Sequence, residues 1–193
     1  MSDTKKEVKE LIPAGTKLTL EEYKVLALRT ESIVDEVKAN KPEYKALLEA
    51  FIACGELLDC LKKKIYYKKS TKYDEKFDSL TDELLTAIAT MKRNRHTPEE
   101  VVDEVSPRIT HGVLGVLTES SELAQAYLKG LNGGELDAVN LQEEMADGAG
   151  GCGTSWYAVI IEDETGLDPY EGMRRNINKL AIRYPEKFTV ENA

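Results

Sequence analysis

The stretch GVLTESSELAQAYLKG, residues 115–130, decides the fold of this chain, together with DAVNLQEEMAD at residues 137–147. Both have the length and the period of an α-helix, and the pair Asn132-Gly133 breaks the chain between them. The same reading predicts helices over most of the chain, at residues 19–40, 42–66, 80–93, a short one from 97, 107–129, 137–164 and 169–183. No strand pattern of similar quality occurs, so the predicted fold class is all-α.

Four acidic residues stand in two pairs within these stretches, Glu119 with Glu122 and Glu144 with Asp147. Residues three apart share a helix face, so each pair directs two carboxylates the same way. In a chain with 32% charged residues such pairs often lie on a solvated face. The first stripe, however, continues through small residues and one lysine, namely Gly112, Gly115, Ala126 and Lys129. These small neighbours on the same helix face favour a metal site between two neighbouring helices.

The four acids predict the kind of metal. Carboxylate oxygens without histidine or cysteine suit Mg²⁺, with Mn²⁺ as a substitute, rather than zinc. A di-iron bundle would need Glu-x-x-His repeats, and neither His96 nor His111 has that spacing to the acids.

The composition of the chain argues against several other classes of protein. A net charge of −9 and a pI near 4.9 argue against a protein that binds nucleic acid through its phosphates. The chain has no run of about 18 apolar residues and no apolar stretch of a signal peptide at its start. We therefore expect a soluble cytoplasmic protein without membrane partners. Three cysteines without a CxxC pair predict reduced thiols rather than disulfides or a zinc site.

The chain organisation predicted from sequence is a polar tail at 1–17 and a single domain at 18–193. Residues 47–64 align with 113–130, with Glu56 over Glu122, and further on Glu83 falls over Glu144. A degenerate repeat and a chance likeness of two amphipathic helices both explain this alignment. In either case the first copy lacks two of the four acids, so we expect it to be structural.

The acidic stretches and two flanking segments resemble a known family. LTLEEYKVLALRTES near the start, the ExxE and ExxD pairs, and the closing GLDPYEGMRRNINKLAIRYPEKF resemble, in this order, the MazG-like all-α nucleoside triphosphate pyrophosphohydrolases. In that family the opening helix leads almost directly into the segment that begins here at Ser106. The resemblance therefore implies a helical bundle in which residues 33–105 form an inserted helical hairpin.

The resemblance also implies an activity. A MazG-like enzyme converts a nucleoside triphosphate, ribo or deoxy, to the monophosphate and pyrophosphate. Glu119, Glu122, Glu144 and Asp147 would be catalytic residues that hold two or more Mg²⁺ ions, and a carboxylate, with Glu119 as one candidate, would accept the proton of the attacking water. Such enzymes form dimers or dimers of dimers. A dUTP- or dCTP-type diphosphatase of the same superfamily and a non-catalytic nucleotide-binding helical protein are the alternatives.

Further residues would contact the substrate. By resemblance Asn176 and Lys179 grip the phosphates, and Lys129 lies at the far end of the acidic stripe. His111 stands eight residues before Glu119, although a single histidine is more often a partly buried structural residue.

One segment departs from the family pattern. The family carries Trp-Tyr on an apolar helix soon after ExxD, whereas here glycine-rich residues 148–155 precede Trp156 and Tyr157. Glycines cost roughly 1 kcal/mol each in a helix interior, so we expect this segment to bulge or to pack where another group comes close. The departure leaves open whether Trp156 and Tyr157 contact the base.

Overall fold

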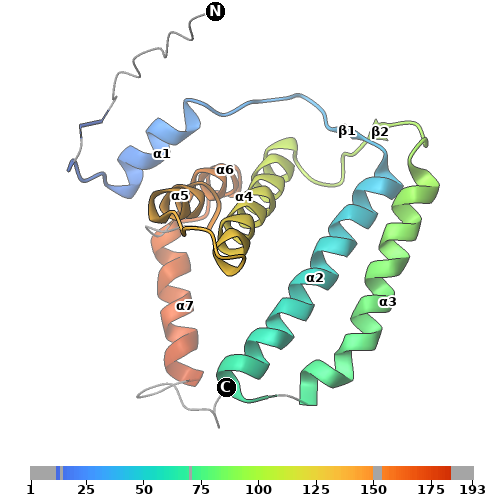
Figure 1. Cartoon of the computed structure of the whole chain (residues 1–193). Coiled ribbons are helices and arrows are strands. Elements are labelled where there is room, and N and C mark those ends of the chain that lie inside the picture. Colours follow the sequence, from blue (N-terminus) through green and yellow to red (C-terminus); the bar gives the residue numbers. More distant parts are fainter. Residues whose placement is uncertain (1–11, 14, 70, 150–153, 184–193) are drawn as a thin grey trace, which may run out of the picture. The chain divides into compact units, whose positions relative to one another are not determined.

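The chain forms seven helices among the residues that the computed structural model describes, which are 12–13, 15–69, 71–149 and 154–183 (Figure 1). They are α1 (Leu20–Leu28), α2 (Lys41–Tyr67), α3 (Thr71–Asn94), α4 (Pro107–Leu131), α5 (Ala138–Glu144), α6 (Trp156–Thr165) and α7 (Pro169–Arg183), with a π-helical turn η1 (Met145–Ala149) directly after α5. The strands are β1 (Lys38–Ala39) and β2 (Glu100–Val101). The all-α prediction is confirmed. None of the described helices has the length and apolarity that crossing a membrane requires.

The chain divides into two compact units. The first comprises Met1–Ser32 and Gly112–Ile160, and the second comprises Ile33–His111 and Ile161–Ala193. Ala27, Val159 and Ile160 are buried in the first unit. Most of the predicted polar tail at 1–17 lies outside the described residues.

The opening helix is shorter than predicted. Thr19 caps α1 as expected, because its Oγ1 accepts from the Glu22 amide at 3.2 Å while the Glu22 carboxylate accepts from the Thr19 amide at 2.8 Å. The helix ends at Leu28 instead of continuing to residue 40. The Thr30 hydroxyl donates to the Ala27 carbonyl at 3.0 Å, and the chain beyond it becomes extended to form β1. Pairing with the distant strand β2 accounts for β1, which local propensity does not predict.

Helix α2 has nearly the predicted bounds of 42–66, but two predictions about the segments that follow it were wrong. Helix α3 was expected at 80–93 and begins earlier, at Thr71. The link is short because Lys68 adopts a left-handed conformation, with φ of 55°. Residues from 97 were expected to be helical, but Glu100–Val101 pair antiparallel with β1 in the register Lys38 with Val101.

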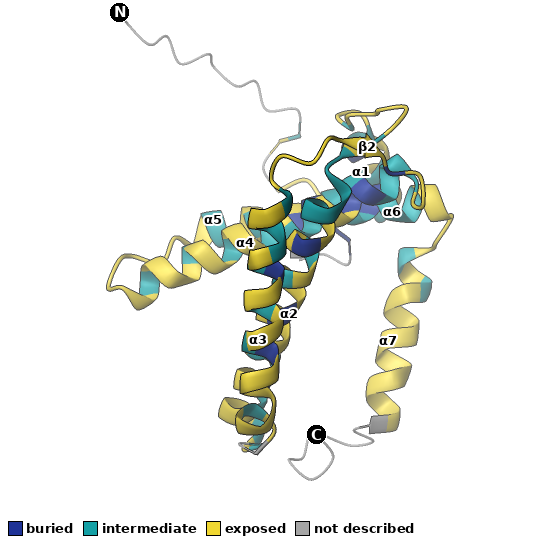
Figure 2. Ribbon diagram, turned by 90° about the vertical axis from the view of Figure 1, so that its right-hand side faces the viewer, coloured by how far each residue is buried: buried dark blue, intermediate teal, exposed yellow. Residues whose placement is uncertain are grey.

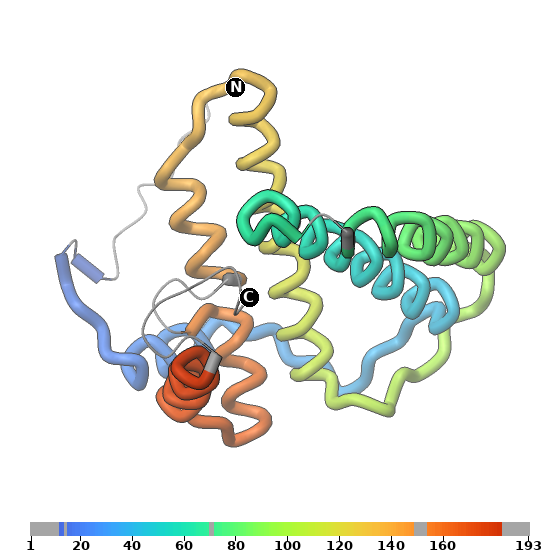
Figure 3. The backbone as a smooth tube through the Cα atoms, turned by 90° about the horizontal axis from the view of Figure 1, so that it is seen from below, coloured from blue at the N-terminus to red at the C-terminus, as the bar shows by residue number. Residues whose placement is uncertain are grey.

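Helices α2 and α3 form a long antiparallel hairpin in the second unit, and Figure 3 shows them running alongside each other. The buried residues of α2 repeat every seven positions, at Ala46, Ala53 and Cys60, and face Leu80 and Ala87 of α3. A repeat of seven is the period of a coiled-coil seam. Figure 2 shows that most residues of both helices are exposed or intermediate. Whether residues 33–105 are an insertion stays a prediction.

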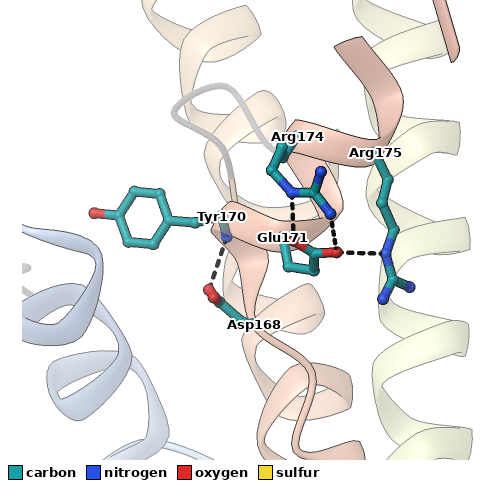
Figure 4. A network of polar contacts seen from close by, with 5 residues as sticks. All are labelled: Asp168, Tyr170, Glu171, Arg174 and Arg175. Atoms are coloured by element: carbon teal, nitrogen blue, oxygen red, sulfur yellow. Dashed lines mark hydrogen bonds and ion pairs between the residues drawn. The ribbon is translucent and has the colours of Figure 1, made fainter. Parts of the chain in front are cut away.

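The closing helix α7 begins and ends as predicted. The Asp168 carboxylate accepts from the Tyr170 amide at 2.9 Å, which caps the first turn (Figure 4). Glu171 accepts from Nε and Nη2 of Arg174, both at 2.6 Å, and from Nε of Arg175 at 2.8 Å. These hydrogen bonds hold the pKa of Glu171 down, at about 2.

Candidate metal centre

Helix α4 and the segment α5–η1 bring the predicted acidic pairs together in the first unit. A turn after α4 reverses the chain, with Gly133 at φ of 82° and the Gly134 amide donating to the Lys129 carbonyl at 3.0 Å. Asp137 then starts α5, because its carboxylate accepts from the amides of Val139 and Asn140 at 3.0 and 3.1 Å. As a result α5 runs back beside α4 (Figure 3).

Three of the four predicted ligands converge. Carboxylate oxygens of Glu119, Glu122 and Glu144 all lie within 4.8 Å of one another. Glu119 and Glu144 are half-buried and Glu122 is exposed. Asn140 donates from its side-chain amide to Glu144, which orients that carboxylate. Hard oxygen atoms at this spacing could hold a divalent cation of the Mg²⁺ type.

The fourth acid, Asp147, stands apart from this group of three on η1. The helix predicted over 137–164 is not continuous, because α5 ends at Glu144, the π-helical turn η1 follows and α6 begins at Trp156. A π turn changes the direction of the side chains that follow it, and such turns are frequent at functional sites. Asp147 remains an electrostatic neighbour, since burial and then the Glu144 charge raise its pKa.

The glycine-rich segment contributes one close contact that explains its composition. A Cβ on Gly148 would come 2.2 Å from the Cβ of Glu119, so only glycine lets η1 approach α4 this closely. This confirms the expected close packing at Gly148. The buried Ser155 extends the support, because its hydroxyl donates to the Gly148 carbonyl at 3.2 Å and accepts from the Ala158 amide. Residues 150–153 lie outside the described residues.

The crowded carboxylates perturb the ionisation of Glu119 most. Burial, a hydrogen bond with Glu144 and the negative charges of Glu122, Asp147 and Glu144 together raise the pKa of Glu119 to about 7. Like charges at short range disfavour the ionised form unless a cation is present. With its pKa at about 7, Glu119 would exchange between its protonated and ionised forms near neutral pH in the absence of a metal.

The two aromatic candidates have different surroundings. The Trp156 ring nitrogen donates to the Ala27 carbonyl at 3.0 Å, which engages this side chain with α1. The Tyr157 ring packs over Gly115, where a Cβ would come 1.9 Å from Cδ1 of the ring. Burial and then the charges of Glu119, Asp147 and Glu122 raise the pKa of Tyr157. Tyr157 thus lies beside the acids, whereas Trp156 connects α6 to α1.

Lys129 lies in a groove that begins at the acidic group. The groove has a volume of about 520 Å³ and is lined by two of the acids and four residues of α4 and α5, namely Glu122, Gln125, Ala126, Lys129, Asn140 and Glu144. Its walls therefore include a cation, two amides and two carboxylates. Asn140 was not among the residues predicted for the site, and the sequence gave no sign that its amide would orient Glu144.

Sequence reasoning also missed the contribution of α1. The Tyr23 hydroxyl donates to the Ala146 carbonyl at 3.4 Å, so α1 touches the π turn that carries Asp147. The sequence offered no signal for this contact, because the two residues are 123 positions apart.

His111, Asn176 and Lys179 belong to the second unit. Their substrate-binding roles stay predictions.

Comparison with known proteins identified no relative of this chain. No family model, curated protein or solved structure matches this chain. The resemblance to MazG-like enzymes therefore stays a prediction that depends on the sequence motifs.

Proposed function

We propose that the first unit binds Mg²⁺ and hydrolyses a nucleoside triphosphate to the monophosphate and pyrophosphate. The observation that carries the proposal is the convergence of Glu119, Glu122 and Glu144 within 4.8 Å. Their mutual repulsion, which raises the pKa of Glu119, would be relieved by a bound cation. Mn²⁺, which has the same preference for oxygen, is the expected substitute.

The residues have separate tasks in this proposal. Glu119, Glu122, Glu144 and Asp147 would hold the metal, which when bound would offset the charge of the phosphates and acidify a water molecule. The groove beyond them would take the polyphosphate, with Lys129 pairing with a phosphate oxygen.

The reaction requires one bond to form and one to break. A water oxygen bonds to the α-phosphorus, and the bond from that phosphorus to the oxygen that bridges it to the β-phosphorus breaks, which releases pyrophosphate. The water loses a proton, and Glu119 is the candidate acceptor. A carboxylate whose pKa lies near neutral pH without metal is suited to exchange a proton at that pH.

The test is a product analysis. The purified chain is incubated with each ribo- and deoxyribonucleoside triphosphate and Mg²⁺, and the products are separated by anion exchange. Monophosphate and pyrophosphate support the proposal, and the ranking of bases separates a general enzyme from a dUTP- or dCTP-type diphosphatase. If no triphosphate turns over with Mg²⁺ or Mn²⁺, the non-catalytic alternative replaces the proposal.

Two variants sharpen the test. Glu119→Gln keeps the size of the side chain but removes the charge, and it should reduce kcat by at least about 10²-fold. Glu83→Gln is the matched control, because Glu83 aligns with Glu144 but is an exposed residue of α3. Equal activity of Glu119→Gln and the wild type would refute the assigned role.

A further inference from the structure

The turn that joins α2 to α3 carries a local excess of positive charge. Residues 60–73 contain six lysines and no acid, although the chain as a whole has a net charge of −9. The six lysines lie at one end of the hairpin, where α2 ends and α3 begins (Figure 1). We call this set the basic tip, and its members are Lys62, Lys63, Lys64, Lys68, Lys69 and Lys72.

Acids of the same chain neutralise only part of this charge. Lys62 and Lys63 share one acid, because both pair with Asp59. Lys64 lies 3.8 Å from Asp74. No carboxylate of the described residues pairs with the other three lysines of the basic tip. Two acids against six lysines leave four positive charges in excess, and extending the count to residue 78 still leaves three.

Lys68 has a backbone conformation that suits a smaller residue. Its φ is 55°, and it is the one residue other than glycine with a positive φ in the described part of the chain. The position caps α2, because the Lys68 amide donates to the Lys63 carbonyl. Glycine is the usual residue at such a cap, since it has no Cβ. The lysine at this position therefore favours a role for its side chain rather than for its backbone.

The lysines of α2 surround the end of the helix and do not follow one face. Successive residues turn by about 100°, so Lys62, Lys63 and Lys64 point in three different directions. Each lies within about 8 Å of the end of α2 along the helix axis, which is about one Debye length at physiological salt. A flat anionic surface that meets the hairpin end-on would attract all of these charges, whereas a partner along one side of α2 would reach only some of them.

Two large apolar side chains stand among the lysines. In the last turn of α2, Ile65 is 61% exposed and Tyr66 is 70% exposed. Tyrosine is favoured at the interface between a membrane and water, and lysine can keep its charge at the headgroups while its stem covers apolar surface. Residues 60–73 contain no arginine, although arginine is the preferred cation for recognising nucleic acid. These features favour anionic lipid over nucleic acid.

We propose that the basic tip docks end-on to the surface of a bilayer that contains anionic phospholipid. The lysines would lie among the headgroups, with Ile65 and Tyr66 at the boundary of the acyl chains. The contact requires no membrane-spanning helix. The expectation of no membrane partner depended on the net charge and on the missing apolar run, and neither property describes one end of one hairpin. The proposal is independent of the enzymatic function, because the acidic group belongs to the first unit.

The first test measures the partition of the full chain onto vesicles by sedimentation. Vesicles of phosphatidylcholine and phosphatidylserine in equal parts should bind the chain at least about 100-fold more strongly than phosphatidylcholine alone, because each lysine near such a surface contributes roughly fivefold. The binding should weaken as NaCl is added. A wild type that shows no preference for the anionic vesicles would overturn the proposal.

A triple variant tests which lysines make the contact. Lys68→Gly, Lys69→Gln and Lys72→Gln together remove three charges without breaking an ion pair of the described residues, and glycine suits the left-handed conformation at position 68. The triple variant should keep its helical circular dichroism and should bind the anionic vesicles about 100-fold more weakly than the wild type.

The matched control loses the same charge at the opposite end of the hairpin. It combines Lys92→Gln, Arg93→Gln and Arg95→Gln, which lie around the end of α3, and it should bind vesicles like the wild type. Equal binding by the triple variant and the wild type would overturn the proposal, as would an equal loss in the control. If the wild type ignores vesicles but binds single-stranded RNA through the same three lysines, the partner is a nucleic acid and the proposal is wrong.

The second test reports how the basic tip meets the bilayer. Tyr66→Trp places an indole in the last turn of α2, and anionic vesicles with acyl chains brominated near the headgroup should quench its fluorescence. The wild type is the control, because its one tryptophan, Trp156, lies in the first unit. Equal quenching of the two proteins on these vesicles would refute the end-on contact.

Discussion

Gly148 shows how one missing side chain can hold a charged site together. Its backbone packs against the side chain of Glu119, where a Cβ would come 2.2 Å from the Glu119 Cβ. The contact brings η1, with Asp147, beside the first acidic pair. The identity of residue 148 should therefore affect the site without affecting the rest of the fold.

We expect Gly148→Ala to weaken Mg²⁺ binding about tenfold or more, because the added methyl group must push η1 or Glu119 aside. Isothermal titration with Mg²⁺ measures the effect. Gly172→Ala is the control, because Gly172 lies in α7 with no atom within 4 Å of a Cβ position. That change should stabilise α7 by roughly 0.5–1 kcal/mol and leave Mg²⁺ binding unchanged. Equal Mg²⁺ affinity for Gly148→Ala and the wild type would contradict the packing argument.

The raised pKa of Glu119 also predicts how the stability of the metal-free protein responds to pH. Its pKa is about 7 in the folded chain against 4.5 for an ordinary glutamate carboxyl, so the folded state holds the proton more tightly than the unfolded state. This contribution to stability is complete below pH 4.5 and is lost as the pH rises to about 7. In EDTA, the melting temperature of Glu119→Gln should fall less than that of the wild type over this range. Parallel curves for the two proteins would show that Glu119 does not titrate in this way.

At the scale of elements, the caps and the long helices were predictable from sequence, whereas the tertiary pairings were not. The Thr19 capping box and the bounds of α7 follow from local residue types, and local chemistry decides them. The strands β1 and β2 depend on backbone pairing between residues about 60 positions apart. The convergence of three of the four acids was predicted from helical spacing, but the π turn that sets Asp147 apart was not, since the close approach of Gly148 to α4 is a tertiary contact.

Asp137, the N-cap residue of α5, should affect both the stability of the chain and its Mg²⁺ binding. Asp137 accepts two backbone amides at the start of a seven-residue helix, and this helix carries Glu144. Asp137→Ala should cost about 1 kcal/mol in urea unfolding and should also weaken Mg²⁺ binding. Asp137→Asn keeps a side-chain oxygen and should restore most of both properties. If Asp137→Ala lowers stability alone, α5 is not the element that positions Glu144.

At the scale of the whole molecule, a net charge of −9 makes bound cations stabilising. A site that binds only the folded chain adds about 2.7 kcal/mol when Mg²⁺ is at about 100 times its Kd. We expect the melting temperature to rise with Mg²⁺ well beyond the rise in NaCl of equal ionic strength. Glu122→Gln combined with Glu144→Gln should reduce the Mg²⁺ effect to that of NaCl. A full Mg²⁺ effect in the double variant would place the stabilising cation elsewhere on the chain.

The short pairing of β1 with β2 has a consequence for the architecture of the chain. Lys38 and Val101 are paired residues, so their Cα atoms are only about 5 Å apart. The polypeptide thus enters and leaves the α2–α3 hairpin at two neighbouring points. The hairpin can therefore be shortened, lengthened or replaced as a unit, because these changes leave its two points of attachment to the chain unchanged.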